Sequence, residues 1–135
     1  MKRYVLDASA LICFFEDRPG ADQVGRLLAQ AAETRQPLAM SVINWGEIIY
    51  SIWRVRGEAA ANQKALEISQ LPILVADADL ELTRLAATFK ARFHLPYADC
   101  FAAALAAQRK AVLVTSDNDF VCLGKQVKIL RPRGR

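Results

Sequence analysis

Hydrophobic residues recur at two spacings along the chain. Short apolar runs predict buried β-strands, at residues 4–6, 37–40, 73–75, 111–114 and 127–130. Between these runs, apolar residues repeat every three or four positions, which predicts helices over residues 10–15, 21–35, 42–56, 58–70, 77–93 and 97–109. Ser41 stands where it can cap the third helix, and Gly57 follows the residue where that helix is expected to end.

The alternation of strands and helices predicts an α/β fold. Strands joined by helices favour a mostly parallel sheet that is covered on both faces, because parallel strands need long crossover connections. Right-handed crossovers then give a three-layer sandwich around a central sheet of four to five strands. In such sheets, ligands bind at the carboxyl ends of strands, where the strand order reverses. Polar residues directly after strands are therefore the candidates for a functional site.

The composition limits the class of protein. The length of 135 residues predicts a single domain over residues 1–135. Apolar residues make up 53% of the chain and charged residues 24%, which excludes a disordered or low-complexity protein. The N-terminal segment reaches Asp7 before any apolar stretch of signal-peptide length, and no stretch could span a bilayer. We expect a soluble, cytoplasmic protein without a membrane partner.

Several familiar kinds of site are absent from the sequence. Cys13, Cys100 and Cys122 are odd in number, form no CxxC pair and lie among apolar residues, which predicts buried thiols. The single histidine, His94, lies at a helix break and is expected in a surface loop, which disfavours Ser-His-Asp or Cys-His catalysis. Asp77 and Asp79 resemble a metal-binding DxD pair, but they begin a predicted helix and are interpreted as capping charges.

The charge is mildly positive and unevenly distributed. Eighteen Lys and Arg residues against fourteen Asp and Glu residues give a net charge of +4, a weak preference for polyanionic partners. No acid follows Asp119, and basic residues crowd the last part of the chain, at Lys125, Lys128, Arg131, Arg133 and Arg135.

Acidic residues stand at the ends of predicted elements. Asp7 directly follows the first strand, and Asp117 follows the strand at 111–114 after Thr115 and Ser116. Each can be interpreted as a helix cap, but parallel neighbouring strands would bring both to one edge of the sheet. Asp99 is the only charge between Leu95 and Gln108. It is either a favourable charge at a helix N-terminus or a buried carboxylate that needs a cation.

The hydrophobic pattern of its helix gives little indication that Glu47 is a functional residue. At 100° per residue it shares the polar side of its helix with Asn44 and Ser51, which is typical of a solvated face. Carboxylates that do converge repel one another and need a compensating cation. Oxygen-only ligands select Mg²⁺ or Mn²⁺ over zinc.

Four segments around these acids resemble the motifs of PIN-domain nucleases, and especially the VapC-type toxins of bacterial toxin–antitoxin modules. The segments are residues 4–11, 41–48, 95–106 and 112–120, in the order and spacing of the family, and the resemblance covers essentially the whole chain. It implies a homodimeric endoribonuclease that cleaves RNA phosphodiester bonds with Mg²⁺ or Mn²⁺ and is inhibited by a cognate, VapB-like antitoxin protein.

The resemblance also implies roles for individual residues. Asp7, Glu47, Asp99 and Asp117 would form the catalytic, metal-binding set, supported by the acid Asp119 and the hydroxyls of Ser9 and Thr115. Two other classes remain open. One is a phosphoacceptor receiver domain, although Asp7 stands alone where that class pairs two acids. The other is a catalytically silent module on the same fold that binds RNA or a protein.

Overall fold

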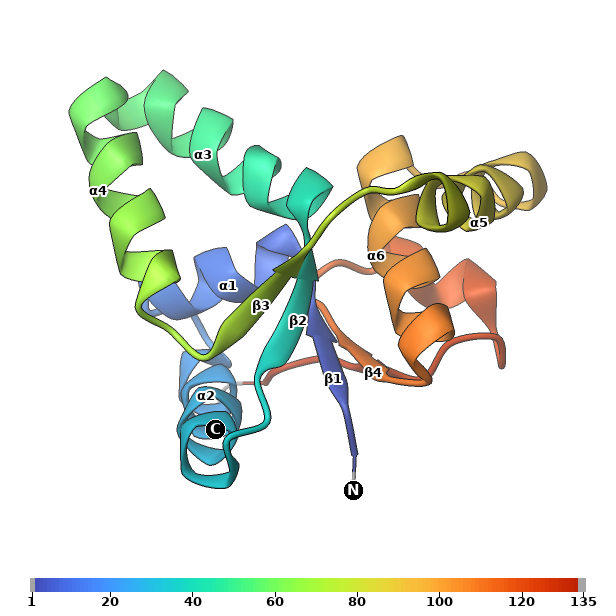
Figure 1. Ribbon diagram of the computed structural model, residues 1–135, viewed down its shortest axis with the longest axis horizontal. Helices are drawn as coiled ribbons and strands as arrows, with labels where there is room; N and C mark the ends of the chain where they lie inside the picture. The colour runs from blue at the N-terminus through green and yellow to red at the C-terminus, as the bar shows by residue number, and fades with distance from the viewer. Residues whose placement is uncertain (1, 134–135) are drawn as a thin grey trace.

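The computed structural model describes residues 2–133, in which strands and helices alternate (Figure 1). The strands are β1 (Tyr4–Leu6), β2 (Leu38–Ser41), β3 (Ile73–Ala76), β4 (Val112–Val114) and β5 (Ile129–Leu130). The helices are α1 (Ala8–Phe15), α2 (Ala21–Thr34), α3 (Val42–Arg56), α4 (Glu58–Ser69), α5 (Leu80–Arg92), α6 (Tyr97–Arg109) and the 3₁₀ helix η1 (Asp119–Leu123).

The five strands form one parallel sheet in the order β3-β2-β1-β4-β5, which confirms the predicted α/β architecture. The chain builds β2 and β3 on one side of β1, then returns to add β4 and β5 on the other side. The strand order therefore reverses beside β1. Because Leu6 pairs with Val114, the residues that follow β1 and β4 meet at the carboxyl edge of the sheet, at this point of reversal.

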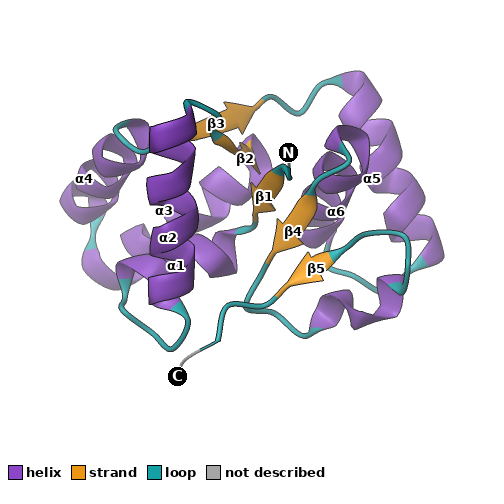
Figure 2. Cartoon of the chain, turned by 90° about the horizontal axis from the view of Figure 1, so that it is seen from below, coloured by secondary structure: helices purple, strands orange, loops and turns teal. Residues whose placement is uncertain are grey.

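Helices cover both faces of the sheet, with α1 to α4 on one face and α5 and α6 on the other (Figures 1 and 2). Each layer has its own apolar core. The core under α1 to α4 includes Leu11 and Met40, and the core under α5 and α6 includes Phe101 and Leu113. Helix α6 is buried from Asp99 to Ala106, which explains why its sequence is apolar almost all round. Its alanines present little bulk, so the helix packs closely on the middle strands.

Two helix starts differ from the predicted ones. The first helix begins at Ala8 rather than at residue 10, because Asp7 caps it. The helix predicted from residue 77 begins at Leu80, where Asp79 accepts a hydrogen bond from the Leu82 backbone amide at 2.8 Å. The capping interpretation is confirmed for Asp79, whereas Asp77 lies outside the helix. Since a single 3₁₀ turn has no repeating apolar spacing, the pattern did not predict η1.

The prediction of three buried thiols is wrong for Cys122. Cys13 and Cys100 are buried, but Cys122 is exposed. In the tight turns of η1, Phe120 and Leu123 occupy the core positions and Cys122 is left facing solvent.

Three further expectations concern the surface. His94 is exposed, as expected for a loop residue. Among the basic residues near the end of the chain, Lys125, Lys128 and Arg133 are exposed, while Arg135 lies outside the described residues. Within residues 2–133, every helix falls short of the length and apolar character needed to cross a membrane.

Candidate active site

Asp7 occupies the carboxyl end of the central strand and is only 3% exposed. Its Oδ1 accepts hydrogen bonds from the Ala10 backbone amide at 2.9 Å and from the Ser9 hydroxyl at 2.7 Å. Its Oδ2 accepts a hydrogen bond from the Thr115 hydroxyl at 2.5 Å. Asp7 is thus a helix cap and also a carboxylate at the predicted edge of the sheet, so its two interpretations do not exclude each other.

The segment after β4 is held against the end of β1 by the same hydroxyls. The backbone amide of Ser116 donates to Ser9 Oγ at 2.9 Å, and that of Asp117 donates to Thr115 Oγ1 at 3.0 Å. Asp117 Oδ1 then accepts a hydrogen bond from the backbone amide of Asp119 at 2.9 Å. These bonds fix the positions of the Asp117 and Asp119 carboxylates relative to Asp7.

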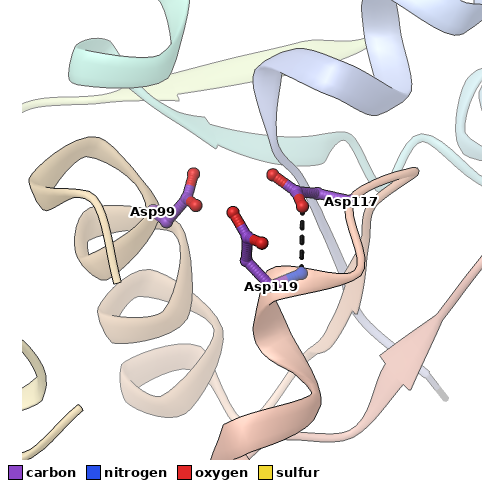
Figure 3. Close-up of side chains that lie close together, drawn as sticks. All are labelled: Asp99, Asp117 and Asp119. Carbon is purple, nitrogen blue, oxygen red and sulfur yellow. Dashed lines mark hydrogen bonds between the residues drawn. The ribbon is translucent and has the colours of Figure 1, made fainter. Parts of the chain in front are cut away.

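Asp99 approaches the same edge from the first turn of α6. Figure 3 shows its carboxylate facing those of Asp117 and Asp119, and one carboxylate oxygen from each of the three lies within 4.8 Å of the others. Asp99 is 9% exposed, and its Oδ2 is buried without a hydrogen-bond partner among the described residues. Burying a carboxylate oxygen without a hydrogen bond costs free energy unless a cation or a donor reaches it.

Asn44 is a site residue that the sequence pattern missed. It is fully buried, and its Nδ2 donates to Glu47 Oε1 at 2.9 Å and to the Ala98 carbonyl at 3.1 Å. The predicted solvated face is therefore wrong for Asn44, because that side of α3 meets the start of α6 instead of water. Glu47 is half-buried beside it. The available signal was the i, i+3 spacing of the two residues on one helix.

The predicted acids influence one another electrostatically. Burial raises the pKa of Asp99 to about 7, with further increases from Asp117, Asp7, Glu47 and Asp119 in that order. Burial also raises the pKa of Asp7 to about 6, against the opposing effect of its three hydrogen bonds. The Asp99 carboxylate therefore lies within electrostatic reach of Asp7, Glu47, Asp117 and Asp119, although Asp7 and Glu47 are outside the group whose oxygens lie within 4.8 Å of one another.

The raised pKa of Asp99 predicts how stability depends on pH. Its folded-state value of about 7 exceeds the ordinary 3.8, so the folded protein holds this proton more tightly than the unfolded chain does. The stabilisation is present at low pH and is lost as pH rises through 4 to 7. Relative to wild type, we expect Asp99→Asn to gain free energy of unfolding across this range, reaching about 2 kcal/mol at pH 8. This is roughly half of the ~4 kcal/mol that the full shift would give, because solvent screens part of the interaction.

Urea unfolding of both proteins with EDTA, from pH 4 to pH 8, measures this difference. Comparing the two proteins at each pH cancels the titration of groups that they share. A difference that stays constant with pH, or a wild type that is the more stable protein at pH 8, would contradict the prediction.

The chemistry of the site suits a hard cation. Among residues 2–133 the ion pairs are Arg18–Glu16 and Lys64–Glu67, so no lysine or arginine of that part of the chain neutralises the carboxylates. The site contributes carboxylate, amide and hydroxyl oxygens, and two of them, Asp99 Oδ2 and Asn44 Oδ1, are buried without a hydrogen-bond partner among residues 2–133. Oxygen ligands of this kind fit Mg²⁺ or Mn²⁺.

Comparisons with known proteins agree with this fold. The family model of the PIN domain matches residues 4–125. No curated protein matches the sequence.

Among solved structures, VapBC2 from Rickettsia felis bound to a DNA fragment from its promoter has a TM-score of 0.77 at 16% identity, covering 95% of this chain and 97% of that one. DNA-bound VapBC from Salmonella typhimurium has a TM-score of 0.74 at 15% identity, covering 97% and 98%. VapC20 from Mycobacterium tuberculosis, described as a sarcin–ricin loop cleaving toxin, has a TM-score of 0.69 at 17% identity, covering 90% and 95%. These likenesses concern the fold, while the family model spans most of the sequence. The chain therefore belongs to the PIN-domain family.

Proposed function

We propose that this protein is a metal-dependent endoribonuclease and the toxin of a toxin–antitoxin module. One observation carries the nuclease proposal: Asp99, Asp117 and Asp119 bring carboxylate oxygens within 4.8 Å of one another in a PIN-domain protein, with one Asp99 oxygen buried and unpartnered. The similar structure described as a sarcin–ricin loop cleaving toxin supports RNA as the substrate class.

Each site residue has a proposed role. Mg²⁺ or Mn²⁺ would be held by Asp7, Glu47, Asp99 and Asp117. Asp119 joins this set because its carboxylate oxygen lies within 4.8 Å of those of Asp99 and Asp117. When bound, such an ion supplies an activated water and offsets the negative charge that develops on the phosphodiester. Ser9 and Thr115 orient the Asp7 carboxylate through their hydroxyls, and Asn44 orients Glu47 through its amide.

The test is cleavage of total RNA by the purified chain. We expect cuts with Mg²⁺ or Mn²⁺ and no cuts with EDTA, because the uncompensated carboxylates repel the phosphate backbone. Calcium, which is larger and accepts more irregular oxygen coordination, serves as the control ion. Intact RNA under every ionic condition, with binding retained, would favour the silent module instead.

The partner proposal rests on the similar structures, several of which are VapBC or other toxin–antitoxin complexes. Helices α3 and α4 expose large apolar side chains, Tyr50, Trp53, Val55 and Leu66, which could receive an apolar antitoxin helix. Among the aromatic residues that could take part in such a contact, Trp53 is exposed, whereas Trp45, Phe14 and Phe15 are half-buried. Homodimerisation and a cytoplasmic location belong to the same proposal. The test is to express the chain together with its neighbouring genes and to purify it. Recovery of the chain without any small bound protein would count against the proposed antitoxin partner.

A further inference from the structure

A positively charged hollow lies at the amino edge of the sheet, at the opposite end from the carboxylates. It has a volume of about 1090 Å³, and no acid is among the described residues that line it. Its charged residues come from three segments of the chain, and they are Lys2, Arg3, Arg109, Lys110, Lys125 and Lys128.

The topology brings these residues together. Lys2 and Arg3 precede β1, Arg109 and Lys110 lead from α6 into β4, and Lys128 precedes β5. Because β1, β4 and β5 are adjacent and parallel, their amino ends meet at one edge of the sheet. Arg3 Nη1 also donates to the backbone carbonyl of Arg109 at 3.5 Å, which holds two arginines side by side.

The cations of the hollow have no acidic partners in the described part of the chain. Both ion pairs found among residues 2–133 lie elsewhere, between Arg18 and Glu16 and between Lys64 and Glu67. A gathering of like charges destabilises the compact state through repulsion. Ordinary structural roles account for three of the six cations: Arg109 and Lys110 suit a helix C-terminus, and Lys128 stands directly before the edge strand β5. They do not account for Lys2, Arg3 or Lys125.

The hollow continues along the open edge of the sheet. A second concavity of about 940 Å³ shares Lys2, Lys125 and Lys128 with the first and follows β5, which Figure 2 shows at the border of the sheet. A third, of about 640 Å³, continues past the end of β5 and is lined by Arg131 and Arg133. A path of this extent suits a polymer of negative charges better than a small anion.

Helix α6 connects the two oppositely charged ends of the molecule. Asp99 lies in its first turn and Arg109 in its last, so at 1.5 Å per residue they are about 15 Å apart along the helix axis. A ligand that reached both ends would have to be longer than the reacting phosphodiester alone.

We propose that the basic hollow and its extension along β5 bind the phosphate backbone of RNA, away from the bond that is cut. The choice of RNA among polyanions rests on the proposed function. Lysine and arginine side chains bind phosphates without reading sequence, so this contact adds affinity for long RNA and leaves the choice of cut site to the carboxylate end.

The test is the double variant Lys125→Glu/Lys128→Glu of the full chain, both positions being exposed. Binding to a single-stranded RNA that spans the sheet is measured in EDTA, where no cleavage occurs. We expect at least a tenfold loss of affinity and a salt dependence (log Kd against log salt) shallower by about 1.4, for two lost phosphate contacts. Cleavage of a trinucleotide around the cut site should be unchanged, whereas cleavage of the long RNA should show a raised KM.

The matched control is Arg54→Glu/Arg56→Glu, which changes the net charge equally at the exposed end of α3, a helix that lines none of the three concavities. Equal losses in the two variants, or unchanged affinity in the Lys125/Lys128 variant, would overturn the proposal; the second outcome would favour an acidic protein segment as occupant. A wild-type chain that cuts no RNA yet binds it through Lys125 and Lys128 would contradict the nuclease function and support the hollow.

Discussion

The variant Asp99→Asn is expected to lose RNA cleavage by more than about 100-fold while it keeps its fold. Mutating groups that merely orient a metal ligand costs about 10- to 100-fold, so removing the charge of a ligand should exceed that range. Asp99 has the strongest claim to this role, because its Oδ2 is buried with no hydrogen-bond partner in the described part of the chain and its pKa is raised to about 7 by burial and four neighbouring acids. The amide has the same shape as the carboxyl but cannot become an anionic ligand.

Cleavage rates and calorimetric Mn²⁺ binding, measured on the same preparations, check this prediction. Asp22→Asn is the control, since it removes an exposed acid from the first turn of α2 and should leave both quantities unchanged. A folded Asp99→Asn protein that cuts RNA at the wild-type rate would remove this residue from the proposed metal set.

The second large effect is expected for Phe120→Ala, at about 3–5 kcal/mol of lost stability. Phe120 is fully buried in the core between the sheet and α6, and it belongs to the short η1 turn. Removing its ring leaves a cavity that short, tightly wound backbone cannot easily close. Because Asp119 is its neighbour in the chain, the variant should also position the Asp119 carboxylate less firmly and cut RNA more slowly.

Urea denaturation measures the change in stability. Val121→Ala is the control, because Val121 is the next residue of the same turn but is 67% exposed. The loss of stability in the Val121→Ala variant should stay within about 0.5 kcal/mol, as for ordinary surface substitutions. Similar losses for the two variants would mean that η1 is not anchored by Phe120.

The fold was largely predictable because its signals are local and repeated. Apolar runs located the five strands, and the spacing of apolar residues located the six α-helices, with errors mainly at their ends. Those errors have a physical cause: capping by Asp7 and Asp79 sets where a helix starts, and a cap depends on one hydrogen bond rather than on a pattern. The turn η1 was missed because five residues are too few to show a period.

The site was predictable only in part. Asp7 and Asp117 were found from their places after strands, and the parallel pairing of β1 with β4 brings those places together. Asn44 and Glu47 could not be found in this way, because a helical wheel separates polar from apolar sides without showing which polar side meets another helix. The contact of Asn44 with the Ala98 carbonyl joins residues 54 positions apart, and such contacts leave no mark in local spacing.

The hydrogen bond from Thr115 to Asp7 joins residues 108 positions apart and ties the segment after β4 to the end of the central strand. In the order of synthesis, Asp7 and Glu47 are in the growing chain long before Asp99, Asp117 and Asp119 are added. A nascent chain that stops before Asp117 therefore carries Asp7 and Ser9 without the segment that they hold in place. Any chemistry that depends on all of these carboxylates can begin only after β4 has been translated and has paired with β1.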